Sequence, residues 1–315
     1  MSELTYYERP VLKEPVWIWA VPLYLYVGGV AGTAMVLGAA GQLAGGASLR
    51  GFVVRCRWVG ALGAVAGSAL LVVDLGRPER FLNMLRVFRP GSPMSVGAWT
   101  LASAASLAAA SAVLEKPDGF SGWLGDAAGL GAGFLGLPLV TYTGVLLGNT
   151  AVPVWQQARA ELPYLFCASA MTATASLLEM MDFGRRERRL ISAFGTAGRV
   201  LELGATASLE RSVSFVEQVE RPLREGPSSV LWKAAAGLTA ASLVVSLLPG
   251  GSKKRKLAGV LGTLGALALR WAIYRAGRTS ARDPHATFAQ QRRGLGAAET
   301  TGIPAVTAAE DMLPE

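Results

Sequence analysis

The chain has 315 residues, of which 51% are hydrophobic and only 17% are charged, against about a quarter in an average soluble domain. It carries a formal net charge of +8 and a single histidine, His285. Because the charges gather in short clusters between long apolar stretches, the composition excludes disorder and argues against a soluble enzyme. One histidine and two cysteines argue against haem, catalytic zinc or an iron–sulfur cluster, since each needs more such ligands.

The apolar stretches predict an all-α integral membrane protein with about eight transmembrane helices in a bundle. A transmembrane helix needs roughly 20 mostly apolar residues. The predicted spans are residues 16–44, 58–75, 96–114, 126–148, 162–181, 190–219, 229–248 and 257–274. Segment 190–219 is the most polar of them, so seven spans remain an alternative. We expect it to form one long helix that continues into water beyond Ser212.

Charged side chains on this sixth helix lie along one stripe. Arg199, Glu202, Glu210 and Glu217 are spaced so that they share a helical face. Such a stripe is typical of a span that faces the protein interior, or of a helix on the membrane surface. Arg199 and Glu202 are also three residues apart, a spacing at which they can pair.

The chain is expected to divide into three parts. These are an outer-face N-terminal segment (1–15), a polytopic helical membrane domain (16–277) and an extended polar C-terminal tail (278–315). His285 falls in the tail, where we expect it to be solvated. Cys56 and Cys167 fall near opposite faces of the bilayer, so we expect no disulfide between them.

The orientation follows from lysine and arginine in the loops. Basic residues are dense at 50–57, 185–189 and 253–256, and Lys116 lies on the same side. The positive-inside rule places this side in the cytoplasm and both termini outside. The net charge of +8 is therefore mostly a topology signal and does not indicate nucleic-acid binding.

Asp74 closes the second apolar segment, and Arg77 follows three residues later. If the helix continues to Pro78, the two side chains lie within reach of each other. An ionisable group in this position is costly unless it is paired or functional. The two interpretations are a structural salt bridge and a site that binds a polar head group and passes protons.

Residues 74–99, DLGRPERFLNMLRVFRPGSPMSVGAW, resemble the motif after the second span of the NrfD/PsrC family, membrane subunits of bacterial respiratory complexes such as polysulfide reductase. Residues 6–32, YYERPVLKEPVWIWAVPLYLYVGGVAG, are similar to that family as well. So is the fourth span, with Pro138, Tyr142, Thr143, Gly144 and Asn149. The resemblance covers roughly residues 6–275 and is most specific in 74–99.

The resemblance implies a helical bundle in the bacterial cytoplasmic membrane that binds menaquinone or ubiquinone near the outer face, without haem or metal of its own. It also implies electron exchange with a four-cluster-type iron–sulfur subunit that is wired to a further catalytic subunit. The chain would then not be catalytic alone. Arg80, Arg86 and Arg89 are the expected docking contacts, because arginines suit acidic partner surfaces.

A quinone site needs hydrogen-bond donors for two carbonyl oxygens, an apolar slot and groups that carry protons. Tyr142 is the best-placed donor, and it matches the tyrosine that the family uses beside the quinone. The other expected members are Asp74, Arg77, Asn149, Trp99 and Tyr24. Some relatives place a histidine in the first span, where this chain has Tyr24 as the candidate replacement donor.

Ionisable residues inside a membrane are functional candidates by default. The predicted proton-transfer residues are Asp74, Glu179, Asp182, Glu202 and Glu210. Glu179 and Asp182 would take up protons from the cytoplasmic side. Two alternatives remain, a passive membrane anchor and a secondary transporter. The transporter lacks the paired Gly/Pro-broken spans of that class.

Overall fold

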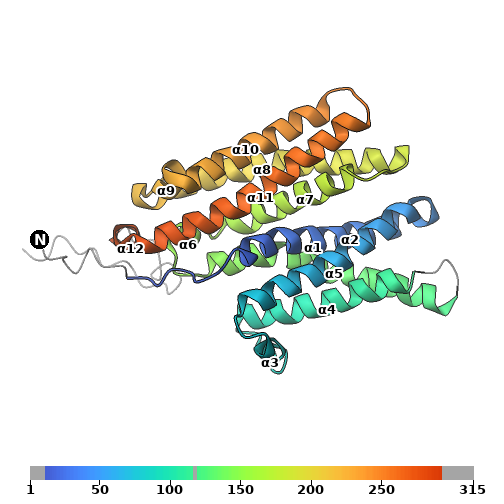
Figure 1. Ribbon diagram of the computed structural model, residues 1–315, viewed down its shortest axis with the longest axis horizontal. Helices are drawn as coiled ribbons and strands as arrows, with labels where there is room; N and C mark the ends of the chain where they lie inside the picture. Colours follow the sequence, from blue (N-terminus) through green and yellow to red (C-terminus); the bar gives the residue numbers. More distant parts are fainter. Residues whose placement is uncertain (1–10, 116–118, 293–315) are drawn as a thin grey trace, which may run out of the picture.

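The computed structural model describes residues 11–115 and 119–292, which form a bundle of long helices (Figure 1). Eight helices in this part of the chain have at least 19 residues: α1 (Ala20–Gly45), α2 (Arg50–Asp74), α4 (Pro93–Val113), α5 (Phe120–Gly148), α7 (Glu161–Glu179), α8 (Arg185–Val213), α10 (Gly226–Leu247) and α11 (Ser252–Arg282). The short helices are η2 (Gly46–Leu49), η3 (Pro78–Arg80), α3 (Phe81–Met84), α6 (Pro153–Gln157), α9 (Glu217–Arg224) and α12 (Pro284–Arg292). The described residues contain no strand, which confirms the predicted all-α class.

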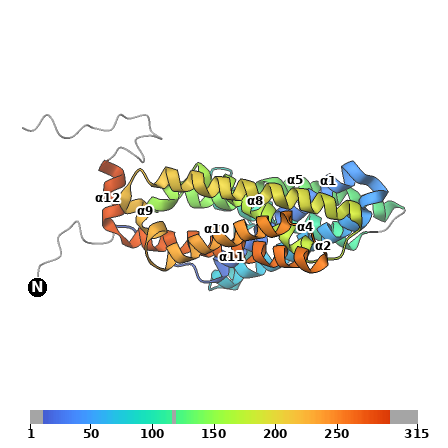
Figure 2. The ribbon, with the colours of Figure 1, turned by 90° about the horizontal axis from the view of Figure 1, so that it is seen from above.

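The long helices form two groups of four. α1, α2, α4 and α5 pack against one another, and α7, α8, α10 and α11 form the second group. The groups meet where α1 contacts α7 and α11 and where α5 contacts α7 (Figures 1 and 2). We name the two ends of the bundle by their residues. The Asp74 end is where α1 begins and α2 ends, and the Glu179 end is where α7 ends and α8 begins.

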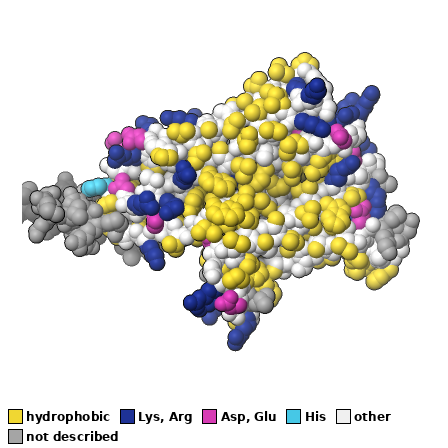
Figure 3. Space-filling view, viewed as in Figure 1, with side chains coloured by type: hydrophobic (Ala, Val, Ile, Leu, Met, Phe, Trp, Pro, Cys, Tyr) yellow, Lys and Arg dark blue, Asp and Glu magenta, His cyan; other side chains and the backbone are white. Residues whose placement is uncertain are grey.

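Six helices are long and apolar enough to cross a membrane, namely α1, α2, α4, α5, α10 and α11. Apolar side chains cover the middle of the face in Figure 3, with Lys and Arg toward the two ends. The chain is therefore a multi-pass membrane protein. The predicted count of eight spans is not confirmed, because α7 and α8 are not among the six. α7 buries hydroxyl side chains such as Thr172 and Ser176, and α8 buries the charged Arg199 and Glu202, so the most apolar stretch of either helix is more polar than those of the other six.

The sixth predicted helix is shorter than expected. α8 ends at Val213, and a new helix, α9, begins at Glu217. The prediction of one continuous helix over 190–219 is therefore wrong in its last turns, since Val213 and Val216 are fully buried and hold the chain against the bundle where it turns.

The extended tail predicted from residue 278 is wrong for 278–292. α11 continues to Arg282 and α12 follows it. The Ser280 hydroxyl accepts a hydrogen bond from the backbone N–H of Val154 at 3.3 Å, and Gly277 packs directly against the Trp155 ring. These contacts with α6 hold the end of α11 in place. Residues 1–10, 116–118 and 293–315, with the predictions that fall on them, lie outside the described residues.

The segment before α1 crosses the Asp74 end and contacts α6 and α11. The Trp17 ring stacks on that of Trp155 with centroids 5.6 Å apart, and the Tyr274 hydroxyl donates to the Trp17 carbonyl. The Glu14 carboxylate accepts from Arg278 at 3.1 Å and also from Arg282. The first described residues are therefore tied to α6 and α11.

Candidate functional site

Asp74 ends α2 and attaches the N-terminal segment to it. Its Oδ1 accepts the backbone N–H of Ile18 at 2.9 Å. Gly76 then adopts a φ of 65°, a left-handed conformation that favours glycine, and turns the chain out of the helix. Arg77 is consequently exposed, and across the described chain no ion pair joins it to Asp74. The salt bridge, one of the two interpretations of this pair, is not formed because the helix ends at Asp74 and does not continue to Pro78.

Two tyrosines come together near the Asp74 end. Tyr24, in the second turn of α1, is 5% exposed, and its ring packs over Gly67 of α2. Tyr142 comes from α5, two turns before that helix ends, and its hydroxyl lies against Gly97 of α4. The two phenols are close enough to interact electrostatically. Neither hydroxyl has a hydrogen bond to another described residue, so both are available as donors.

Glycine makes this arrangement possible. A Cβ on Gly97 would lie 2.0 Å from Tyr142 Cζ and 2.2 Å from its hydroxyl oxygen. A Cβ on Gly67 would lie 3.3 Å from the Tyr24 ring, which is a tight contact. The Tyr142 phenol therefore occupies space that an ordinary side chain at Gly97 would take. Sequence reasoning singled out Tyr142 and Tyr24 but not Gly97.

The remaining predicted quinone residues lie nearer the surface of the same end. Trp99 follows Gly97 by two residues, is 37% exposed, and contacts Phe88 edge to face at 6.2 Å. Asn149 caps the C-terminus of α5 and is exposed, as Arg77 is. The structure thus places Tyr24 and Tyr142 on the packed helices α1 and α5, while Trp99 lies on the same turn of α4 as Gly97 but on a different face of that helix. It leaves Asn149 and Arg77 at the rim.

The predicted docking arginines lie on a projection at the Asp74 end. This projection is formed by η3, α3 and the turns that follow, and it stands clear of the bundle (Figures 1 and 3). Arg80, Arg86 and Arg89 are all exposed on it. Val87 and Phe88, at 55% exposure each, add apolar surface beside them. Cationic and apolar side chains together are typical of a protein-binding surface.

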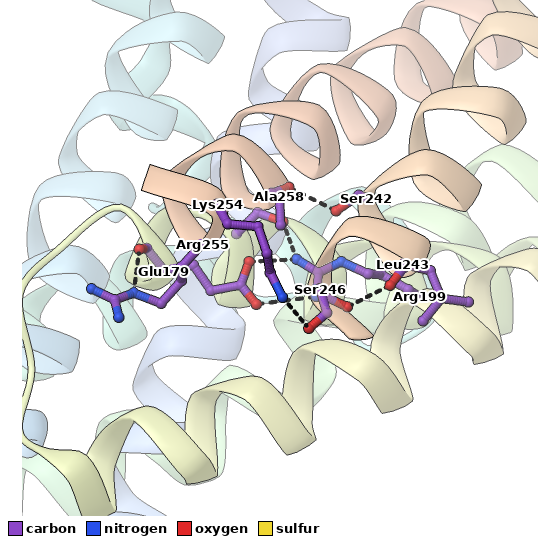
Figure 4. A network of polar contacts seen from close by, with 9 residues as sticks. Glu179, Arg199, Ser242, Leu243, Ser246, Lys254, Arg255 and Ala258 are labelled. Carbon is purple, nitrogen blue, oxygen red and sulfur yellow. Dashed lines mark hydrogen bonds and ion pairs between the residues drawn. The ribbon is translucent and has the colours of Figure 1, made fainter. Parts of the chain in front are cut away.

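An ion pair lies inside the second helix group (Figure 4). Arg199 of α8 donates to Glu179 of α7 from Nη2 to Oε2 at 2.6 Å and from Nη1 to Oε1 at 3.1 Å. The two side chains are 0% and 3% exposed. Arg199 Nη2 also lies 3.3 Å from the Ser176 hydroxyl. Arg199 therefore pairs with Glu179 of the neighbouring helix, and no ion pair with Glu202, the alternative that the spacing left open, is formed in the described part of the chain.

Glu202 and Arg270 face each other, and both have polar atoms without a hydrogen-bond partner in the described chain. They come from α8 and α11, are each 2% exposed, and interact electrostatically. Arg270 Nη2 donates to the Phe166 carbonyl at 3.0 Å, and its guanidinium lies 3.8 Å above the Phe166 ring centroid. Glu202 Oε2 and Arg270 Nε and Nη1 have no hydrogen-bond partner among the described residues. Such buried atoms are normally satisfied by ordered water or a ligand.

The other predicted proton carriers are placed differently. Glu210 accepts a hydrogen bond from Trp232 Nε1 at 2.6 Å. The Asp182 side chain is 85% exposed and lies 3.8 Å from Arg255, whereas Glu179 is buried. Glu179 and Asp182 therefore occupy different environments, one inside the bundle and one in solvent.

A buried arginine near the Glu179 end was placed in a loop by the sequence analysis. Arg57 lies inside α2 and is 5% exposed. Its Nη2 donates to Asp126 at 2.6 Å and to Gln42 at 2.8 Å. The apolar residues on both sides of Arg57 and an acid at the start of the fourth span were the available signals. This network joins α1, α2 and α5.

Comparison with known families matches residues 10–119 to the family described as "Polysulphide reductase, NrfD". The match confirms the resemblance read from residues 6–32 and 74–99. It includes Tyr24, Asp74, Gly97 and Trp99, and it ends before Tyr142. No curated protein matches the chain.

Proposed function

We propose that this chain, a multi-pass membrane protein whose residues 10–119 match the NrfD family, is the quinone-reactive membrane subunit of a respiratory oxidoreductase complex. The observation that carries the proposal is that Tyr24 and Tyr142 lie on the packed helices α1 and α5 near the Asp74 end, with neither phenol hydroxyl bonded to another residue of the described chain. A quinone, when bound, supplies the two-electron chemistry that the chain itself lacks.

The residues present fit such a group. Quinone carbonyls accept hydrogen bonds, and each phenol can donate one. Tyr142 is half-buried and Tyr24 is buried, so their hydroxyls lie in low-dielectric surroundings where a hydrogen bond is stronger. Trp99 adds an exposed aromatic face two residues after Gly97. Tyr142 and Tyr24 would hold and orient the ring, and Trp99 would border it on the lipid side.

The acidic and basic groups have separate roles in this proposal. Asp74 positions the N-terminal segment over the site through Ile18, and it would exchange protons with solvent from the rim. Arg77 and Asn149, both exposed at the same end, would contact the polar edge of the quinone or the partner. The quinone would be menaquinone or ubiquinone.

Eight spans in the bacterial cytoplasmic membrane complete the arrangement. α7 and α8 have the length of the six apolar helices or nearly so and pack alongside them, α7 among α1, α5 and α11 and α8 against α7 and α10, so we treat both as spans. Basic residues at the Glu179 end, such as Arg185 and Lys253, favour that end as cytoplasmic. The Asp74 end, with both termini, then faces outward.

The proposed partners follow from this orientation. The projection that carries Arg80, Arg86 and Arg89 would bind a four-cluster-type iron–sulfur subunit, which passes electrons to a further catalytic subunit. Proton movement across the bundle would run past Glu202 and Arg270, whose unpartnered polar atoms can bind water.

The test is quinone-dependent turnover of the whole complex with Tyr142→Phe. We expect at least a tenfold loss, because the variant removes only the hydroxyl. Tyr164→Phe is the matched control, since Tyr164 begins α7 at the same end but is 74% exposed. Unchanged turnover in Tyr142→Phe and in Tyr24→Phe would identify the chain as a passive membrane anchor instead.

A further inference from the structure

A cationic pocket opens at the Glu179 end, away from the two tyrosines. It encloses about 400 Å³ between the start of α8, the end of α10 and the start of α11. Its basic lining residues are Arg185, Arg188, Arg189, Lys254 and Arg255. The only acidic lining residue is Glu179, among the residues that the structure describes. A cavity of this size holds a small organic group.

The positive charge in this pocket is largely uncompensated. Glu179 is already paired with Arg199, which does not line the pocket (Figure 4). The negative charge of Glu179 is therefore compensated by Arg199 and does not offset the basic residues of the pocket. Arg255 lies 3.8 Å from Asp182 and donates to the Glu179 carbonyl at 3.2 Å. Among the residues that the structure describes, Lys254 donates only to the Ser246 carbonyl, at 3.4 Å.

The three arginines of α8 have even less compensation. Within residues 11–115 and 119–292, none of Arg185, Arg188 and Arg189 forms an ion pair. Glu187, on the same helix turn, is engaged with the backbone N–H of Gly184 at 2.7 Å. Like charges held around one cavity repel each other, and an anion in the cavity removes that cost.

The backbone at the start of α11 adds to the positive electrostatic potential of the pocket. α11, 31 residues long, begins at the pocket, and its N-cap Gly251 has no side-chain cap. The first N–H groups of such a helix are therefore free to bind an anion, and the helix dipole favours one. This supports the charge argument from the side chains without depending on it.

Apolar surface adjoins the pocket. Leu248 and Pro249 line it, and Leu248 is 54% exposed. Leu247 and Val244, on the last turn of α10, are 65% and 58% exposed, and Leu257 of α11 is 51% exposed. A free inorganic anion would make no favourable contact with these apolar side chains, whereas acyl chains would cover them.

We propose that this pocket binds the headgroup phosphate of an anionic phospholipid. The phosphate is held by Arg188, Arg189 and Lys254, and the acyl chains lie on the exposed leucines at the end of α10 and the start of α11. Basic pockets between membrane helices bind lipid headgroups through this combination of charge and apolar surface. The site is separate from the proposed quinone site and does not depend on it.

The experiment uses the full-length chain purified in a mild detergent. Native mass spectrometry would compare the first bound dioleoyl-phosphatidylglycerol with dioleoyl-phosphatidylcholine, which has the same acyl chains. We expect the unmodified protein to prefer the anionic lipid by about tenfold or more, and Arg188→Gln/Arg189→Gln/Lys254→Gln to lose that preference. If the triple variant lost all lipid binding, the single variant Lys254→Gln would be compared instead. It should show a partial loss of the preference for the anionic lipid.

The matched control is Arg186→Gln/Lys253→Gln/Lys256→Gln. It removes the same number of charges from the same two helix starts, but none of its residues lines the pocket. The control should keep the lipid preference. Equal loss in both triple variants would overturn the proposal in favour of diffuse surface attraction, and no preference in the unmodified protein would overturn it by showing that the pocket does not select an anionic lipid.

A second arm separates lipid from free phosphate. Inorganic phosphate is added at constant ionic strength while bound phosphatidylglycerol is counted. We expect little displacement at millimolar phosphate, because the acyl chains contribute to binding. Complete displacement would show that the pocket takes a free phosphate ion and would overturn the lipid assignment.

Discussion

Arg199 of α8 and Glu179 of α7 form a bidentate ion pair in the interior of the second helix group, with Nη2 2.6 Å from Oε2. Both side chains are almost fully buried, so each charge depends on the other for compensation. Removing one partner of such a pair typically costs about 3–5 kcal/mol, because the other charge is left buried and unpaired. The pair therefore fixes how α7 and α8 pack.

We expect Arg199→Gln to lower the thermal unfolding midpoint of the detergent-solubilised chain markedly, as followed by circular dichroism. The double variant Glu179→Gln/Arg199→Gln should lose less than the sum of the two single variants, since it leaves no unpaired charge. Arg221→Gln is the control: its pair with Glu225 is 3.0 Å long but exposed, and such pairs contribute about 0–1 kcal/mol. A similar small effect in all variants would show that the buried pair does not stabilise the fold.

We expect Gly97→Ala to reduce quinone-dependent turnover of the complex. The new methyl group would lie 2.0 Å from Tyr142 Cζ, so the phenol must move away from its present position. Because the end of a side chain moves more easily than a helix, stability should change little. Gly237→Ala in α10 is the control, since it has nothing within 4 Å and should leave turnover unchanged. Full activity of Gly97→Ala would mean that the position of Tyr142 does not matter.

We expect Glu202→Gln to diminish the pH change that accompanies turnover in proteoliposomes beyond that of quinone chemistry itself. Glu202 is buried beside Arg270 and has a carboxylate oxygen without a hydrogen-bond partner in the described part of the chain, whereas glutamine cannot carry a proton. Glu217→Gln, at the exposed start of α9, serves as the charge-matched control. If neither variant changes proton movement while electron transfer continues, Glu202 is a structural residue.

Attachment of the N-terminal segment should depend on pH. Hydrogen bonds from Arg282 and then Arg278 hold the pKa of Glu14 below its ordinary value of 4.5. Because the folded-state pKa is depressed, this contact stabilises the segment above the unfolded pKa and is lost as pH falls through the folded value. Limited proteolysis before α1 should be slow and constant from pH 7 to about 5, and faster below about 4.5. Glu14→Gln should be cleaved faster at neutral pH, and equal rates in both proteins would contradict the proposed attachment.

Local sequence patterns were sufficient for the helices but not for their charged contacts. Apolar runs predicted α1, α2, α4, α5, α10 and α11. An apolar stretch in lipid must form a helix, because a helix makes all its backbone hydrogen bonds within itself. The boundaries were less accurate at α8, where Val213 and Val216 pack against other helices. That contact depends on neighbours far away in the sequence.

The sequence by itself determined that this is a polytopic helical membrane protein with an NrfD-type region, since length, apolarity and the 74–99 motif are local properties. It also identified Tyr24 and Tyr142 as candidate hydrogen-bond donors and Glu179 and Glu202 as candidate proton carriers. Only the tertiary structure decided their partners. Spacing along one helix shows which side chains share a face, but not which neighbouring helix meets that face. Arg199 therefore binds Glu179 instead of Glu202, and Asp74 binds the Ile18 backbone instead of Arg77.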